Sequence, residues 1–328
     1  MNFLPFEKPI IEIENKIVEL EKESQEKGID LSSSIEELRR ELNSEIDRIF
    51  SNLSAWEIVQ IARHPERPKT SDYIKHLIPD YVYFCGDRLL REDSAIFGAL
   101  GTLDNQTVMI IGHNKGKNVK ENLKFNFGMA NPEGYRKALR LMRLAEKFNC
   151  PIITLVDTPG AFPGIEAEEH GQAEAIARNL QEMFTISVPI ICIVTGEGGS
   201  GGALGIGVSD KLLMLQYSIY SVISPEGCAS ILWKDSSKAQ LAADLLNLTA
   251  KDLINFKIID KIIEEPPGGA HRNPKETLNK VKYELINTLS SIRKEYSSQN
   301  DLIFKRYEKF RKIASYDYLN SIKRENKM

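Results

Sequence analysis

The highest concentration of glycine in the chain lies between residues 196 and 207, a stretch that reads Gly-Glu-Gly-Gly-Ser-Gly-Gly-Ala-Leu-Gly-Ile-Gly and holds seven of the 21 glycines. It follows a strand-like apolar run, Pro189–Val194, and leads into a segment that predicts the start of a helix, Ala203–Ser209. Glycines at the N-terminus of a helix present unhindered backbone N–H groups where the helix dipole favours negative charge. The loop therefore predicts a place that binds or stabilises an anion.

Two nucleotide-binding interpretations of this loop lack their expected partners. The spacing Gly196-x-Gly198-x-x-Gly201 matches the dinucleotide-binding fingerprint, which also needs an acidic residue about 20 positions later for the ribose. No acid stands near Ser221, and the nearest candidate is Glu226. Asp157-Thr158-Pro159-Gly160 is similar to the DxxG element of GTPases. Its best phosphate-loop partner, Gly112–Asn118, is one residue too short and ends in Asn where Ser or Thr should hold magnesium.

A third interpretation is an oxyanion hole, in which two glycine N–H groups point at an oxygen that becomes negative in a transition state. Removing one such donor costs about 3–4 kcal/mol of transition-state stabilisation. This chemistry needs glycine and no particular side chain. The structural alternative is a close helix–strand contact that only glycine permits, and it explains Gly205 and Gly207 better than the two Gly-Gly pairs.

Composition and charge exclude several classes of protein. The chain has 328 residues, of which 42% are hydrophobic and 27% charged, as in ordinary globular proteins. The net charge of −3 gives no general attraction to nucleic acid, although residues 1–50 carry 13 acidic and 7 basic side chains and residues 271–328 carry 7 and 14. No run of 18 apolar residues and no N-terminal leader are present, so we expect a soluble, intracellular protein without a membrane partner.

The histidines and cysteines favour no metal site. The four cysteines form no CxxC pair and fall in or beside apolar runs, which predicts reduced core residues. His113, His170 and His271 are isolated in sequence, which argues against metal ligation.

Hydrophobic periodicity predicts helices first and then alternating strands and helices. Apolar residues at three- and four-residue steps predict a helical hairpin before residue 50, with Gly28 ending its first helix, and the proline-rich stretch 64–68 is expected to end the helical part. Short β-rich runs follow from Tyr81, and Asn131-Pro132 is expected to begin a helix that runs to about Phe148. Strand and helix then alternate, with a strand over 152–156 and a helix over 168–184, which predicts an α/β protein with a mostly parallel sheet. The last expected elements are a helix over 239–248, an apolar run at 258–263 and a helical segment from about Pro274.

Long sequence strings identify a family. The chain resembles the carboxyltransferase alpha subunits of multisubunit acetyl-CoA carboxylase over nearly all of residues 1–275. The strings that carry the resemblance are Ala62–Pro68, Asn126–Met129, Pro132–Arg140, Asp157–Ala161, Gly196–Gly207, Ile223–Trp233 and Gly268–Pro274.

The resemblance implies a fold and a set of partners. The expected fold is crotonase-like (ClpP/crotonase), built of stacked ββα units, with an N-terminal helical extension over 1–80, a carboxyltransferase core over 81–270 and a basic helical segment over 271–328. The implied partner is a beta subunit of the same fold that carries zinc and most of the CoA site, in an assembly of two alpha and two beta chains. Biotin would arrive on a biotin carboxyl carrier protein loaded by biotin carboxylase.

The resemblance also implies site residues. The backbone N–H groups of Gly201 and Gly202 would be the oxyanion donors on the biotin side, and Gly198 and Gly199 would shape the adjacent turn. The biotin cleft would be lined by Gly160, Ala161, Phe162, Gly164 and Ser200. Cationic side chains that could meet CoA phosphates, or simply face solvent, are Lys115, Lys117, Lys120, Arg136 and Lys137.

The activity implied by the resemblance is transfer of the carboxyl group from carboxybiotin to acetyl-CoA, giving malonyl-CoA for fatty acid synthesis in a bacterial cytoplasm or a plastid stroma. Two alternatives stay open. The chain could be a non-catalytic assembly subunit whose glycine loop is only structural, or a crotonase-like hydratase or isomerase that acts alone on acyl-CoA.

Overall fold

A single twisted sheet organises the computed structural model, which describes residues 3–313. Within these residues the sheet has eight strands in the order β1-β2-β3-β4-β5-β6-β8, and β7 pairs with the end of β5. The strands are β1 (Val82–Tyr83), β2 (Ile96–Leu103), β3 (Gln106–His113), β4 (Ile152–Thr158), β5 (Ile190–Gly199), β6 (Lys211–Leu215), β7 (Ile219–Ser221) and β8 (Lys261–Ile263).

The predicted mostly parallel sheet is confirmed. β1, β2 and β3 are antiparallel neighbours, whereas every pairing from β3 to β8 is parallel. The β2–β3 hairpin turns at Asp104 and Asn105, whose φ angles of 48° and 62° suit a tight hairpin turn. Because parallel strands end at the same edge, the segments that follow β4 and β5 lie side by side there.

Helices occupy most of the remaining chain. Gly28 ends the first helix with a left-handed φ of 65°, as predicted. The described helices of the N-terminal third are α1 (Lys8–Lys27), α2 (Ser32–Phe50), α3 (Ala55–Ala62) and α4 (Thr70–Leu77). Those that follow are α5 (Val119–Lys124), α6 (Pro132–Lys147), α7 (Ile165–Glu169), α8 (Gln172–Met183), α9 (Ser200–Leu204), α10 (Pro225–Trp233), α11 (Ala239–Leu246), α12 (Ala250–Asn255), α13 (Pro274–Glu295) and α14 (Gln299–Lys312).

Two helix boundaries differ from the sequence prediction. The helical part does not end at the proline-rich stretch, since α4 begins two residues after Pro68. Its side chains Tyr73, Ile74 and Leu77 are buried against the sheet. The single helix expected over residues 168–184 is two helices, α7 and α8. Gly171, with a φ of 83°, separates them.

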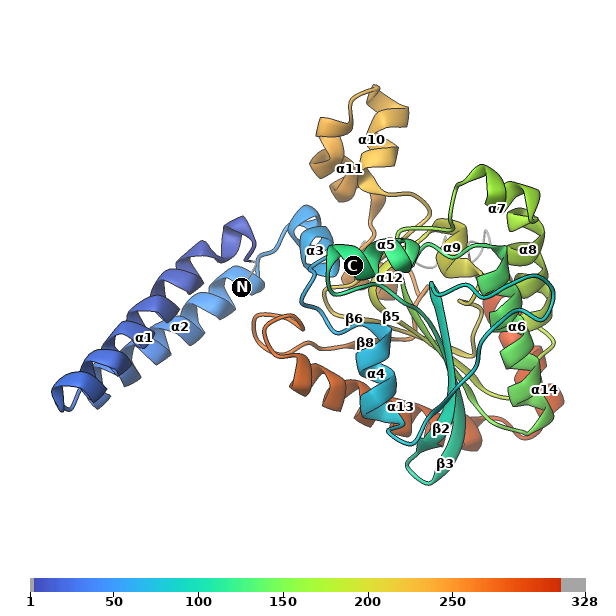
Figure 1. Ribbon diagram of the computed structural model, residues 1–328, viewed down its shortest axis with the longest axis horizontal. Helices are drawn as coiled ribbons and strands as arrows, with labels where there is room; N and C mark the ends of the chain where they lie inside the picture. The colour runs from blue at the N-terminus through green and yellow to red at the C-terminus, as the bar shows by residue number, and fades with distance from the viewer. Residues whose placement is uncertain (1–2, 314–328) are drawn as a thin grey trace, which may run out of the picture.

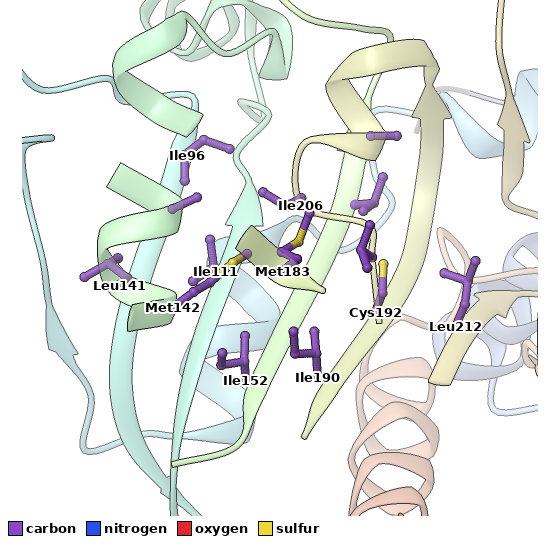
Figure 2. Close-up of a cluster of buried hydrophobic side chains, with 14 of the residues drawn as sticks. Ile96, Ile111, Leu141, Met142, Ile152, Met183, Ile190, Cys192, Ile206 and Leu212 are labelled. Atoms are coloured by element: carbon purple, nitrogen blue, oxygen red, sulfur yellow. The ribbon is translucent and has the colours of Figure 1, made fainter. Parts of the chain in front are cut away.

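Helices cover both faces of the sheet (Figure 1). Helices α6 and α8 pack on one face through Leu141, Met142 and Met183, which meet the strand residues Ile152 and Ile190 (Figure 2). Helices α4 and α13 cover the other face. The strands between these layers are buried on both sides, as parallel strands usually are.

The N-terminal hairpin of α1 and α2 extends away from the sheet (Figure 1). Its base is held by a separate apolar cluster that includes Ile10, Ile46, Phe50, Ile61 and Tyr217.

The C-terminal helix α14 is anchored by a fully buried arginine. Arg306 pairs with Asp210 at 2.7 Å and donates to the carbonyl oxygens of Met183, Ile186 and Val188 at 2.7–3.0 Å. Residues 314–328 of the predicted basic segment lie outside the described residues. Among residues 3–313, no helix is both long enough and apolar enough to span a membrane.

The prediction that the four cysteines are reduced core residues holds for only some of them. All four cysteines are free, and Cys150 and Cys192 are buried. Cys85 is exposed, so the expectation that all four are core residues is wrong: the run Tyr81–Cys85 forms only a two-residue edge strand, which leaves its end at the surface.

Candidate active site

The glycine loop forms a sharp strand-to-helix turn. Strand β5 continues through Gly199, five residues beyond the predicted end, because residues 197–199 pair with β7. Helix α9 then begins at Ser200, three residues before the predicted start, and is only one turn long. Ser200 makes the turn with a φ of 49°, a left-handed conformation that costs an ordinary residue about 1–3 kcal/mol. Such strain accumulates at sites where the surrounding structure has to fix the backbone.

Helix α9 begins with backbone N–H groups that the helix itself does not pair. The N–H groups of a first helical turn have no acceptor within the helix, and in α9 these belong to Ser200, Gly201 and Gly202. At the other end of α9, the Gly205 N–H bonds to Gly201 O at 2.9 Å. Both predicted oxyanion donors therefore lie in the first turn of α9, where Gly201 is half-buried and Gly202 is buried.

The loop packs directly on the backbone that follows β4. A Cβ built on Gly199 would lie 2.1 Å from Pro159 O, and one built on Gly202 would lie 2.4 Å from Gly160 C. A Cβ on Gly201 would meet only Ile176 Cδ1, at an ordinary 3.6 Å. The close-contact role expected for Gly205 and Gly207 therefore extends to Gly199 and Gly202, and Gly201 is the position where sterics do not demand glycine.

The residues predicted for the biotin cleft fall into two groups. Gly160 and Ala161 touch the glycine loop, and Phe162 continues the same segment, with its N–H bonded to Ala130 O at 3.0 Å. Gly164 caps the start of α7. Ser200 lies elsewhere, in a largely apolar groove of about 280 Å³ with Leu204, Tyr220 and Val222 among its lining residues, and residues 160–164 are not part of that lining.

Buried charges link the ends of β4 and β5. Lys115 Nζ lies 2.8 Å from Asp157 Oδ1 and 3.4 Å from Glu197 Oε2, and Asp157 Oδ1 also accepts the Glu197 N–H at 3.0 Å. Burial alone would raise the pKa of Asp157, but the charges of Lys115 and Lys69 outweigh it and hold that pKa below its usual value. The Asp157–Lys115–Glu197 contacts fix the two loops relative to one another.

Arg63 extends this network to α10. It pairs with Glu197 at 2.7 Å and with Glu226 at 2.6 Å. The acid considered as a ribose ligand is therefore an ion-pair partner, which gives the dinucleotide interpretation no support.

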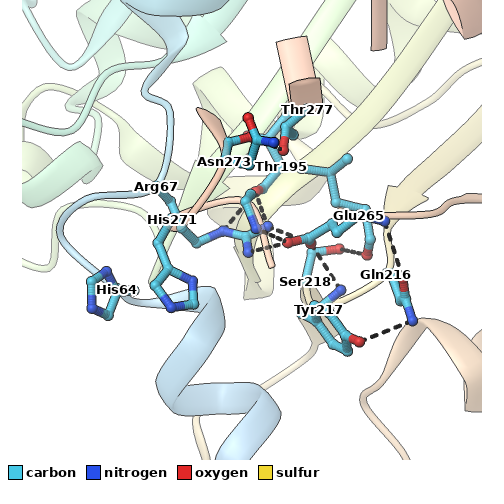
Figure 3. A network of polar contacts seen from close by, with 12 residues as sticks. His64, Arg67, Thr195, Gln216, Tyr217, Ser218, Glu265, His271, Asn273 and Thr277 are labelled. Carbon is cyan, nitrogen blue, oxygen red and sulfur yellow. Dashed lines mark hydrogen bonds and ion pairs between the residues drawn. The ribbon is translucent and has the colours of Figure 1, made fainter. Parts of the chain in front are cut away.

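A second buried ion pair, between Arg67 and Glu265, contacts strand β5 at Thr195. Arg67 donates to both carboxylate oxygens of Glu265 at 2.8 Å and to Thr195 O at 2.9 Å (Figure 3). Glu265 also accepts the N–H groups of Tyr217 and Ala270. The proline-rich string at 64–68 thus has a structural explanation, because its arginine fixes the strand that carries the glycine loop.

Most of the cations considered for CoA phosphates have acidic partners in this chain. Lys115 is in the buried network, Lys117 pairs with Asp72 at 2.6 Å, Arg136 with Asp87 at 2.9 Å and Lys137 with Glu92. Lys120 is exposed on α5. Sequence spacing gave no indication of these partners, because each acid is at least 42 positions away in the chain.

Distant histidines also meet. His64 and His271 stack with ring centroids 4.2 Å apart (Figure 3). His271 Nε2 also lies 3.0 Å from Glu7 Oε1. Ligand atoms of the three residues lie within 4.8 Å of one another, so His271, which is isolated in sequence, has His64 and Glu7 as neighbours in space. His64 Nδ1 accepts the Glu66 N–H and Arg272 lies 3.4 Å from Glu7, an arrangement that suits hydrogen bonding and ion pairing better than metal ligation.

Known proteins resemble this chain over its whole described length. Residues 3–314 match the family model described as acetyl co-enzyme A carboxylase carboxyltransferase-like. Acetyl-coenzyme A carboxylase carboxyl transferase subunit alpha of Xanthomonas campestris pv. campestris (strain B100) is 52% identical over 96% of this chain and 98% of its own. The protein of the same name from Histophilus somni (strain 2336) is 55% identical over the same shares.

Solved structures share the fold at low sequence identity. A Pseudomonas malonate decarboxylase hetero-tetramer in complex with coenzyme A aligns with a TM-score of 0.58 at 14% identity, over 80% of this chain and 97% of that one. Transcarboxylase 12S with methylmalonyl-coenzyme A bound aligns with a TM-score of 0.52 at 18% identity, over 68% and 44%. These matches confirm the predicted crotonase-like α/β fold. With its glycine turn, its full-length family match and relatives above 50% identity, the chain belongs to the acetyl-CoA carboxylase carboxyltransferase alpha-subunit family.

Proposed function

We propose that this chain provides the biotin side of a carboxyltransferase site, at which a carboxyl group carried by biotin passes to acetyl-CoA to give malonyl-CoA. Family membership supports the reaction class, because the relatives are named as carboxyl transferase subunits. The observation that carries the assignment of residues is the turn at 199–202, where first-turn N–H groups and glycine-only contacts coincide.

The residues at this turn fit a bound biotin group. Gly201 and Gly202 belong to the first turn of α9, whose N–H groups have no acceptor within the helix. Because Gly199 and Gly202 have no side chain, the backbone of residues 159–161 can lie directly beside them. Biotin, when bound, supplies the carboxyl group and a ureido oxygen that becomes negative as that group leaves. The N–H donors of this chain would stabilise the developing charge, and the rigid loops keep the donors aligned without reorganisation.

The ion network is the second contribution of this chain. Lys115, Asp157 and Glu197 hold the two loop backbones in register, so that the donors and the 159–161 segment keep a fixed spacing. Orientation of this kind lowers the barrier by restricting reactants to a productive geometry. No side chain has to act as an acid or base in this proposal.

A partner subunit completes the proposal. Helices α10 and α11 stand away from the sheet (Figure 1) and carry exposed apolar side chains, among them Ile231, Leu232 and Leu245. Exposed apolar patches of this kind mark protein interaction surfaces. We propose a carboxyltransferase beta subunit, bearing zinc and most of the CoA site, as the partner in an assembly of two alpha and two beta chains.

Further parts of the proposal concern context. Biotin would be delivered by a carrier protein that biotin carboxylase loads, in fatty acid synthesis in a bacterial cytoplasm or a plastid stroma. The division into 1–80, 81–270 and 271–328 is likewise a proposal. The second candidate function is a non-catalytic assembly subunit, which the steric need for glycine at positions 199 and 202 favours.

Reconstitution separates these candidates. Biocytin-dependent loss of the carboxyl group from malonyl-CoA is measured with this chain alone and with a beta subunit of the family. We expect activity only in the mixture. Activity of this chain alone on an enoyl-CoA would support the hydratase alternative, and an inactive but verified complex would contradict the transfer proposal.

A further inference from the structure

A run of left-handed residues lies beside the candidate site, in one of the strings that carry the family resemblance. Asn126, Phe127 and Gly128, which form the short turn η2, have φ angles of 46°, 56° and 81°. Asparagine and glycine tolerate this conformation, whereas a bulky residue such as phenylalanine adopts it at a cost in stability. Strained residues persist where the surrounding structure fixes them, and they are concentrated at functional sites.

The side chain of Phe127 does not explain the strained backbone by packing into the core. Phe127 is 45% exposed. A single exposed phenylalanine is ordinary on a protein surface. An exposed phenylalanine in a left-handed turn is not ordinary, because asparagine or glycine would form the same turn at a lower cost. The combination points to a ring that is displayed for a ligand.

The residue after Phe127 fixes the turn against the candidate site. A Cβ built on Gly128 would lie 2.9 Å from Asp157 O and 3.0 Å from Lys115 Cγ, so glycine allows the turn to lie against the end of β4 and the buried ion network. The Gly128 N–H also bonds back to Phe125 O at 2.8 Å. Phe127 is thus held at the carboxyl edge of the parallel strands, where α/β proteins bind their ligands.

The chain that follows Phe127 joins the segment predicted to line the biotin cleft. Ala130 O accepts the Phe162 N–H at 3.0 Å. The buried Gln172 amide nitrogen donates to Ala130 O at 2.9 Å and to Phe162 O at 3.0 Å. These bonds hold the backbone beyond Phe127 next to residues 160–164.

The charges beside the turn favour an uncharged ligand. Lys115, the cation next to Gly128, is already paired with Asp157 and Glu197, so it is not available for a phosphate of CoA. A phenyl ring offers apolar and aromatic contacts and no charge. The bicyclic ring of biotin is uncharged, whereas the adenine of CoA comes with phosphates, so Phe127 suits biotin better.

We propose that Phe127 is a specificity-determining residue for biotin: its ring packs on the bicyclic ring of the biotin group and helps to orient it toward the glycine turn. This inference rests on the proposed function, because it adds a contact to the same site. The left-handed turn holds the phenyl ring in place before biotin arrives, which reduces the conformational entropy lost on binding.

Three variants in the assembled complex separate the ring from the backbone. Phe127→Ala and Phe127→Gly both remove the ring, but only glycine relieves the left-handed strain, and Phe127→Tyr keeps a ring. We expect KM for biocytin to rise about fivefold or more in both ringless variants and to stay within about twofold in Phe127→Tyr, with KM for malonyl-CoA within about twofold throughout. Thermal unfolding of the full-length chain should give Phe127→Gly a Tm about 1–3 °C above that of Phe127→Ala.

These variants can overturn the proposal in several ways. If activity follows stability, so that Phe127→Gly is clearly more active than Phe127→Ala, the ring is structural. A raised KM for malonyl-CoA in place of biocytin, or an unchanged KM for biocytin in Phe127→Ala, would equally overturn it. Lys257→Gly is the matched control, because Lys257 is also left-handed, with a φ of 55°, and precedes β8 at the opposite edge of the sheet. A rise in KM for biocytin in this control equal to that in Phe127→Gly would overturn the assignment to the ring.

Equilibrium dialysis of biocytin distinguishes this proposal from the proposed function, since it needs no carboxyl transfer. The unmodified complex should bind biocytin at least about fivefold more tightly than the Phe127→Ala complex. Equal binding by the two, or no measurable binding by either at millimolar biocytin, would overturn the contact. A complex that binds biocytin through Phe127 and transfers no carboxyl group would contradict the proposed function alone.

Discussion

Two neighbouring glycines should respond very differently to the same small substitution. In Gly202→Ala the new Cβ would lie 2.4 Å from Gly160 C and 2.6 Å from Ala161 N, both backbone atoms that cannot rotate away. Carbon atoms in contact prefer a separation of about 3.5–4.0 Å, so the two loops must separate by about 1 Å. Overpacking of this kind costs about 1–3 kcal/mol of stability, and a misplacement of about 1 Å costs about 100-fold in rate.

Gly201→Ala is the matched control. Its Cβ would meet only Ile176 Cδ1 at 3.6 Å, and both variants keep their backbone N–H groups. In the assembled complex we expect biocytin-dependent decarboxylation of malonyl-CoA to fall about 100-fold or more in Gly202→Ala and no more than about fivefold in Gly201→Ala. Thermal unfolding of each variant reports the stability cost separately. Equal losses in the two variants, or full activity in Gly202→Ala, would refute the steric account of this turn.

Three further substitutions test the buried charges. Lys115→Met leaves Asp157 buried without its ion-pair partner, whereas Glu197 keeps Arg63, so the free energy of unfolding should fall by about 3–5 kcal/mol. Lys115→Met/Asp157→Asn should recover part of this loss, and a denaturant titration that shows no recovery would contradict the coupling. Lysine in Arg306→Lys cannot supply all the donors with which Arg306 reaches Asp210 and three carbonyl oxygens, so the free energy of unfolding should fall by about 3–5 kcal/mol. A fall of less than about 1 kcal/mol in the same denaturant titration would show that Arg306 does not anchor α14. Burial lowers the pKa of Lys69 to about 8, from an ordinary value of 10.5. Between pH 8 and 10.5 the unfolded chain therefore binds a proton that the folded protein lacks, so the free energy of unfolding should rise with pH over this range by roughly 3 kcal/mol relative to Lys69→Met. Parallel curves of unfolding free energy against pH for the two proteins would contradict this expectation.

The order of strands and helices was predictable because local patterns encode it. Apolar runs such as 152–156 and 190–194 became β4 and β5, and Asn131-Pro132 marked the start of α6 within a residue. Boundaries failed where tertiary pairing decides them. Strand β5 extends through Gly199 because β7, which begins 20 residues further on, pairs with residues 197–199, and Gly198 also pairs with Thr158 of β4. The eight-residue helix α4 was missed because its buried face is defined by the sheet beneath it and not by a long periodic pattern.

The candidate site was predictable in its backbone and not in its side chains. Glycine density pointed to the turn at 199–202, since few other structures need so many adjacent glycines. The Asp157–Lys115–Glu197 network and the stacking of His64 on His271 join residues 40 to more than 200 positions apart. Nothing in the spacing of one sequence specifies such contacts. The spacing of residues also gave no indication that Ser200 lines an apolar groove in which residues 160–164 take no part.

The most direct test removes a single N–H group from the turn without adding an atom to the steric contact. Gly202→glycolic acid, introduced as a backbone ester, deletes the Gly202 N–H and weakens Gly201 O as the acceptor of the Gly205 N–H. Gly205→glycolic acid breaks that same 2.9 Å bond and leaves the Gly202 N–H intact, so it serves as the control. In the assembled complex we predict that the Gly202 ester loses about 10²- to 10³-fold in kcat for carboxyl transfer and that the Gly205 ester loses less than about tenfold. Equal activities of the two esters would contradict the claim that this turn stabilises the charge formed in the reaction.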